Sequence, residues 1–161
     1  MHCRVYGGWA VLRDPGGRVH EYFAVVWSEW DAPHLGIQPG ECKHQTFFEF
    51  LTLLLTLLVW GSWCIDESMA ILGDNVGALQ SALSLSGRGT LLAVSRELSW
   101  RKARHRWLFD VGHLPSEFNV VADALSRMTD PMGVPWPSVA LGSATMKSAP
   151  KVAEIWKAGP Q

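Results

Sequence analysis

The chain begins with two short, mainly apolar runs and then changes to a helical period of polar residues. The two runs, Val5–Leu12 and Val19–Trp27, are rich in aromatic and β-branched residues and flank the turn sequence Asp-Pro-Gly-Gly at 14–17. They predict a β-hairpin over residues 4–27. From Glu41 to Trp60 the polar residues recur at helical steps, which predicts a long helix with one polar stripe: Gln45, Glu49, Thr52 and Thr56.

The second half of the chain continues with shorter elements. Apolar runs predict strands over residues 68–72 and 107–113, and helical patterns cover 76–85, 90–106 and 116–128. From Thr129 onward proline and glycine become frequent, so residues 129–161 are predicted to be a linker or a disordered tail. The order of elements predicts an α/β fold, with a mixed sheet of about five strands and helices on both faces.

Residues 50–65 carry no charge, which raises the alternative of a membrane-attached protein. The run is shorter than the ~20 apolar residues of a spanning helix, and acids bound it at Glu49, Asp66 and Glu67. A buried core helix is therefore the favoured interpretation, and we expect no membrane partner.

Composition limits the class of protein. With 161 residues, of which 48% are hydrophobic, the chain can form one domain with a sizeable core, and its net charge of -1 gives no general sign of nucleic-acid binding. Three scattered cysteines argue against a disulfide framework or a zinc knuckle. Residues 1–20 lack the apolar core of a secretory signal. We expect an intracellular protein, cytoplasmic or nuclear and not secreted, whose domain is truncated at its N-terminus because Met1 leads directly into strand-like sequence.

Three acids stand out by position: Glu49 lies on the polar stripe, Asp74 follows a predicted buried strand, and Asp123 lies in the last predicted helix. Open α/β sheets place active sites at the carboxyl ends of strands. Acids gathered there repel one another unless a cation is present, and carboxylates suit Mg²⁺. The ordinary alternatives are a helix cap for Asp74, a solvated Glu49, and a pair between Asp123 and Arg127.

A long motif then adds a family resemblance. Residues 113–127, His-Leu-Pro-Ser-Glu-Phe-Asn-Val-Val-Ala-Asp-Ala-Leu-Ser-Arg, closely resemble the closing motif of retroelement ribonuclease H domains, with Ser116 where glycine is usual. Gly73-Asp74-Asn75-x-x-Ala78 looks like the strand end of DIRS-type and gypsy-like elements. Residues 44–49 resemble the segment of the first long helix that carries its Glu, and residues 7–12 resemble the first strand after the catalytic Asp-Ala-Ser. The resemblance covers roughly residues 2–128.

This resemblance implies a ribonuclease H-like fold in which Glu49, Asp74 and Asp123 are catalytic carboxylates that bind Mg²⁺ or Mn²⁺. The substrate would be the RNA strand of an RNA–DNA hybrid, and a reverse-transcriptase domain of the same polyprotein would lie upstream. The family's first-strand Asp is expected near His2, yet no acid precedes Asp14. Loss of a shared metal ligand is costly, so we expect low or absent activity. The alternative is a non-catalytic remnant that serves as a nucleic-acid-binding or structural module.

Candidate substrate contacts are Asn75, His113 and the basic end of the predicted helix 90–106, represented by Arg101, Lys102 and Arg104. Asn75 is also suited to cap the next helix, and His113 to a structural role in a turn. The basic residues are equally consistent with a solvated helix end stabilised by the helix dipole.

Overall fold

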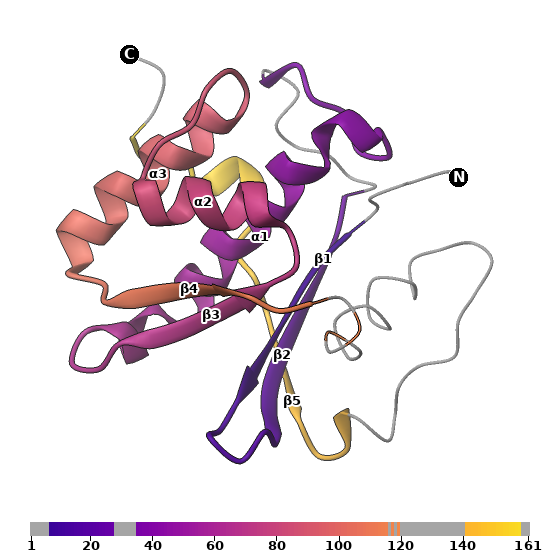
Figure 1. Ribbon diagram of the computed structural model, residues 1–161, viewed down its shortest axis with the longest axis vertical. Helices are drawn as coiled ribbons and strands as arrows, with labels where there is room; N and C mark the ends of the chain where they lie inside the picture. Colours follow the sequence, from indigo (N-terminus) through magenta and orange to yellow (C-terminus); the bar gives the residue numbers. More distant parts are fainter. Residues whose placement is uncertain (1–6, 28–34, 116, 118, 120–140, 159–161) are drawn as a thin grey trace.

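The computed structural model describes residues 7–27, 35–115, 117, 119 and 141–158 (Figure 1). It is a mixed α/β structure, as predicted from the order of elements. The elements are β1 (Gly7–Arg13), β2 (Val19–Val26), α1 (Gln45–Trp60), β3 (Met69–Gly73), α2 (Val76–Ser84), α3 (Leu91–His105), β4 (Phe109–His113) and β5 (Thr145–Lys147).

The strands form two separate sheets rather than the single sheet of about five strands that we expected. One sheet has three strands in the order β1-β2-β5, and the other contains the parallel pair β3 and β4. The prediction was wrong on this point because local patterns identify strands but do not determine which strands pair. The predicted helix over residues 116–128 lies largely outside the described residues.

The hairpin of β1 and β2 forms as predicted, in antiparallel register from Gly7 opposite Val26. Its turn is held by Asp14, whose carbonyl accepts a hydrogen bond from the Gly17 amide at 2.9 Å and whose carboxylate accepts one from the Arg18 amide at 3.0 Å. Gly17 has a φ of 86°, a conformation that glycine adopts without the steric cost of a side chain. The Asp-Pro-Gly-Gly sequence therefore determines where the hairpin reverses.

Helix α1 is the centre of the core, and eleven of its sixteen residues are buried. It begins at Gln45, four residues after the predicted start, because Cys42–His44 form a 3-10 turn. The polar stripe does not face solvent throughout. The hydroxyls of Thr52 and Thr56 are buried and donate to backbone carbonyls four residues earlier in the helix, at 2.8 and 2.9 Å. Such local bonds satisfy a hydroxyl without a solvent contact.

Strand β1 crosses α1 at this stripe. A side chain on Gly8 would collide with the Thr52 hydroxyl and the Trp27 ring, so the absence of a Cβ allows the strand to approach the helix closely. Aromatic contacts extend the packing, with Trp27 and Phe48 ring centroids 5.2 Å apart. The stretch Cys42–Cys64 is long and apolar enough to cross a membrane by length and composition. However, 67% of its most apolar 18 residues is buried inside the structure.

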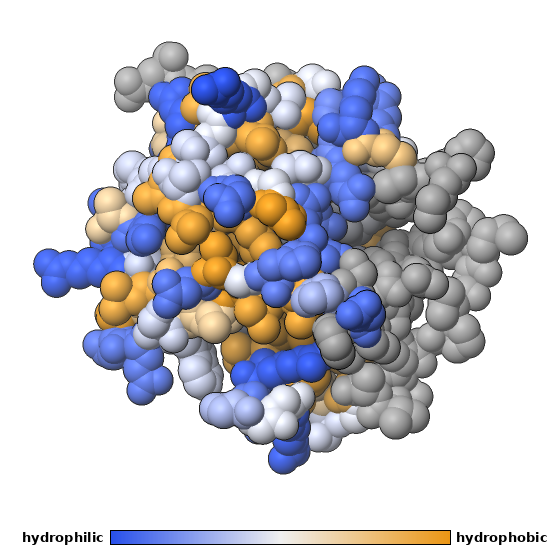
Figure 2. Space-filling model, in the orientation of Figure 1, coloured by the Kyte–Doolittle hydropathy of each residue, from blue (hydrophilic) through white to orange (hydrophobic). Residues whose placement is uncertain are grey.

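Sheet β3–β4 packs one face on the helices. Met69 and Ile71 of β3 contact the core, whereas Ala70 and Leu72 point to the other face and are exposed. Figure 2 shows apolar residues gathered over α2 and this sheet, on the side that faces the viewer. Among the described elements, helices therefore cover one face of this sheet and not both.

The C-terminal segment, residues 141–158, departs from the predicted linker or disordered tail. β5 pairs in parallel with β2, with Glu21 opposite Thr145, and Val152 and Ile155 are buried in the main core. Frequent prolines and glycines are typical of disordered segments and led to the prediction of a tail. The burial of a few apolar side chains is nevertheless enough to hold this segment on the core.

Candidate functional site

The structure brings two of the three predicted acids together. Glu49 lies one turn into α1, is partly buried and has no hydrogen-bond partner among the described residues, and Asp74 follows β3 directly and is exposed. Burial, together with the negative charge of Asp74, raises the pKa of Glu49 to about 7. A carboxyl with this environment gains from a nearby cation.

The topology explains this meeting of residues from different parts of the chain. β3 and β4 run parallel with Gly73 opposite His113, so both strands end at one edge of the sheet. The Leu114 amide donates to the Gly73 carbonyl at 2.8 Å and holds the two strand ends together. Asp74 and the exposed His113 are consequently presented at the same edge, as expected for the carboxyl ends of parallel strands.

Asn75 has the role of a helix cap. Its side-chain oxygen accepts a hydrogen bond from the Ala78 amide at 2.9 Å at the start of α2. Its amide nitrogen also donates to the Thr46 hydroxyl at 3.5 Å, three residues before Glu49 on α1. Asn75 thus joins the start of α2 to α1 and helps to keep Asp74 beside Glu49.

Asp123 lies outside the described residues, so its part in the site stays a prediction. Within the described ranges, no group of three or more His, Cys, Asp and Glu side chains is arranged to hold a metal ion. The oxygen ligands of Glu49 and Asp74 nevertheless suit a hard divalent cation, which would relieve their mutual repulsion.

The three basic residues predicted to contact substrate differ in exposure and in their partners. Arg101 is mostly buried, pairs with Glu97 at 3.2 Å and donates to the Ile155 carbonyl at 2.6 Å. Lys102 lies 4.7 Å from the centre of the Phe109 ring, and Arg104 lies over the exposed Trp100. Because α3 leads into the start of β4, this helix end is at the opposite edge of the sheet from Asp74 (Figure 1).

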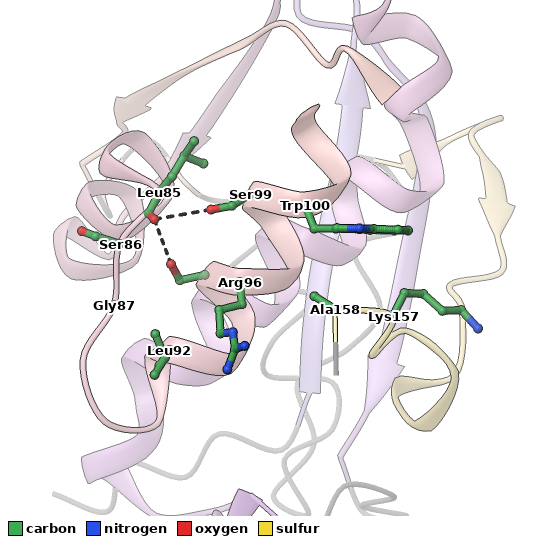
Figure 3. Close-up of a pocket in the computed structure, with 10 residues that line it drawn as sticks. Leu85, Ser86, Gly87, Leu92, Arg96, Ser99, Trp100, Lys157 and Ala158 are labelled. Carbon is green, nitrogen blue, oxygen red and sulfur yellow. Dashed lines mark hydrogen bonds between the residues drawn. The ribbon is translucent and has the colours of Figure 1, made fainter. Parts of the chain in front are cut away.

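A shallow groove forms a second feature, which the sequence patterns did not indicate (Figure 3). Its volume is about 630 Å³, and it lies between the loop after α2, the outer face of α3 and the C-terminal segment. The charged and aromatic side chains that line it are Arg96, Trp100 and Lys157. The spacing of Arg96, Trp100 and Arg104 at four-residue steps was visible in the sequence, whereas Lys157 enters only through the folded C-terminal segment.

Comparison of the chain with protein-family models, curated proteins and solved structures gives no match. The functional argument therefore depends on the residues themselves. A pair of carboxylates near the carboxyl end of two parallel strands, one of them partly buried with its pKa raised to about 7, can bind a divalent cation through oxygen ligands.

Proposed function

We propose that the chain is a ribonuclease H-like domain of a retroelement polyprotein that acts on RNA–DNA hybrids. The observation that carries the proposal is that the charge of Asp74, at the carboxyl end of β3, acts on the partly buried Glu49, whose pKa is raised to about 7. These acids are 25 positions apart in the chain, and they are two of the three that the resemblance to ribonuclease H domains singles out. A reverse-transcriptase domain of the same polyprotein is the expected partner.

In this proposal Glu49 and Asp74 hold Mg²⁺ or Mn²⁺, with Asp123 as the further carboxylate. A divalent ion held there would supply activation of water and stabilisation of the leaving oxygen of a phosphodiester. The chain itself contributes the position of the carboxylates: α1 keeps Glu49 partly out of water, and the Asn75 cap fixes the residue that follows Asp74. His113, on the neighbouring strand end, is placed to contact substrate or to support the turn.

Catalysis is expected to be weak or absent because one acid of the resemblance is missing. No acid occurs before Asp14 in the sequence, and Asp14 is engaged in the hairpin turn with Arg18 and His20. Groups that act as a unit lose most of their effect when one is removed. A second candidate function follows from the same observation: a non-catalytic domain that binds nucleic acid.

The test is Mn²⁺ titration followed by relaxation of backbone NMR signals. We expect saturable broadening of signals around Glu49 and Asp74 that is lost in Asp74→Asn and in Glu49→Gln. Asp66→Asn is the matched control, since Asp66 is an exposed acid in the turn at the other end of β3. Equal broadening in wild type and Asp74→Asn would overturn the metal site.

A cleavage assay then separates the two candidate functions. RNA in a labelled RNA–DNA hybrid is incubated with Mg²⁺ and either wild type or Asp74→Asn. Slow cleavage that disappears in Asp74→Asn supports the enzyme, and metal binding without cleavage supports the non-catalytic domain. Cleavage that is the same in both proteins contradicts the assignment of Asp74.

A further inference from the structure

We infer a second nucleic-acid site on the outer face of α3 and the adjoining C-terminal segment, with single-stranded nucleic acid as its ligand. Phosphates would lie against Arg96, Arg104 and Lys157, and a base would stack on Trp100. This inference does not rest on the proposed function, because the site shares no residue with the carboxylate pair.

The first argument is the arrangement of side chains along α3. Arg96, Trp100 and Arg104 follow one another at four-residue steps, which places neighbours about 6 Å apart along the helix. The side of α3 that packs on the core is formed by other residues, including Val94 and Leu98. Trp100 is 39% exposed, and the Arg104 guanidinium lies 5.4 Å from the centre of its ring. Part of the indole thus remains in water, with the guanidinium groups of Arg104 and Arg101 near the ring.

The second argument is charge. Among the residues that the structure describes, no acidic side chain lines the groove, although the whole chain has a net charge of -1. The side chains of Arg96 and Lys157 form no ion pair with other described residues, whereas the acid of the same helix, Glu97, is buried and paired with Arg101. The groove therefore combines local positive charge with an otherwise nearly neutral molecule, which favours a polyanion.

The third argument concerns the polar groups that could read a specific ligand. Ser95 and Ser99 both donate to the Leu85 carbonyl, at 3.0 and 3.4 Å, so these hydroxyls are used to hold the loop after α2 on α3 (Figure 3). The groups left for recognition are the cations and the indole. Cations with a stacking ring bind single strands with little sequence preference, and the ring favours a nucleic acid over an acidic peptide.

The groove is distant from the carboxylate pair. Asp74 precedes α2 and Leu85 follows it, so about 13 Å of helix separates the two regions. The groove and the carboxylate pair share no residue, so a base stacked on Trp100 and the phosphates beside it would be bound without Glu49 or Asp74. We expect each site to survive the loss of the other.

The experiment measures fluorescence anisotropy of a labelled oligothymidylate of about 15 nucleotides, a length suited to single-strand sites, over a range of salt concentrations. Trp100→Ala is expected to weaken binding about tenfold. Arg96→Ala and Lys157→Ala should each reduce the dependence of log affinity on log salt by about 0.7. Arg18→Ala, which removes an exposed cation from the hairpin turn, is the matched control and should bind as wild type does. Because all these positions are exposed, melting curves should be unchanged.

Further ligands separate the sources of affinity. An abasic oligonucleotide of the same length and an acidic polypeptide should both bind more weakly than the oligothymidylate, because neither has bases to stack on Trp100. Equal binding of the abasic strand would refute the stacking role. Equal loss in Arg18→Ala and Arg96→Ala, or tighter binding of the polypeptide, would refute the site. Asp74→Asn should leave this affinity unchanged, which keeps the outcome independent of the metal site.

Discussion

Glu49 and Glu97 are both glutamates that a helix turns inward, but their surroundings differ. Glu97 is 1% exposed, pairs with Arg101 at 3.2 Å and accepts a hydrogen bond from the Ala158 amide at 2.5 Å. Glu49 has no hydrogen-bond partner among the described residues, and its charged neighbour is another acid, Asp74. Glu97 is thus a structural group whose charge is balanced within the protein, while Glu49 lacks such balance and is suited to an external cation.

Removal of the balancing cation should give the largest effect. Arg101→Ala leaves Glu97 as a buried charge with one remaining partner, and we expect a loss of about 3–5 kcal/mol in the free energy of unfolding. Urea denaturation at neutral pH measures it. The double variant Glu97→Leu with Arg101→Met should recover a substantial part of this loss, because it leaves no buried charge. If Arg101→Ala unfolds at the wild-type urea concentration, the structural role of the pair is wrong.

Removal of the unbalanced charge of Glu49 should increase the free energy of unfolding. In the folded protein Glu49 keeps its proton up to about pH 7, whereas its ordinary pKa is 4.5. Below pH 4.5 Glu49 is protonated in the folded and the unfolded protein, so it does not change the free energy of unfolding with pH. As the pH rises from 4.5 to 7, ionisation in the unfolded state alone progressively destabilises the fold. Above that range Glu49→Gln should be more stable than wild type by up to roughly 3 kcal/mol.

The measurement compares urea denaturation of wild type and Glu49→Gln at pH 4 and pH 8. The difference should vanish at the lower pH, where both side chains are neutral. Mn²⁺ should stabilise wild type at pH 8 and have no such effect on the Gln variant, because only the carboxylate gains from the cation. A difference that is the same at both pH values would show that Glu49 is not an unbalanced charge.

A smaller effect is expected at the cap that holds the acid pair together. Asn75→Ala removes the hydrogen bond from the Ala78 amide and should cost about 1 kcal/mol. Asn75→Asp keeps a capping oxygen and should lose less stability, but its added charge should raise the pKa of Glu49 further. Thermal denaturation and NMR titration of Glu49 measure the two quantities. Equal stability of the Ala and Asp variants would contradict the capping role.

Much of the local structure was predictable because it depends on short-range periodicity. The hairpin, α1, α2, α3, β3 and β4 all occur within a few residues of their predicted positions. The division into two sheets and the docking of residues 141–158 were not predictable, because both depend on contacts between distant segments. The apolar residues that anchor the C-terminal segment, Val152 and Ile155, are too few to produce a periodic signal.

In the candidate site, too, the local elements were predictable and the contacts between distant segments were not. Asp74 follows β3 as predicted, but β3 is not the buried strand that the apolar run predicts, since Ala70 and Leu72 are exposed; the approach of Glu49 to Asp74 depends on how α1 packs. The sequence predicts Arg101 among the cations of a basic helix end, either solvated and stabilised by the helix dipole or in contact with substrate. Only the folded C-terminal segment shows that Arg101 and Glu97 face inward, where they bind the backbone at Ile155 and Ala158.

The pairing of β5 with β2 has a consequence for colloidal behaviour. β2 is rich in aromatic and β-branched residues, and β5 occupies its outer edge opposite Glu21, Tyr22 and Phe23. A long strand edge with unpaired backbone groups is a template for joining another molecule. Detachment of the C-terminal segment would therefore expose the edge of β2 and favour self-association. In the attached state the short strand β5, which ends in the charged Lys147, covers this edge.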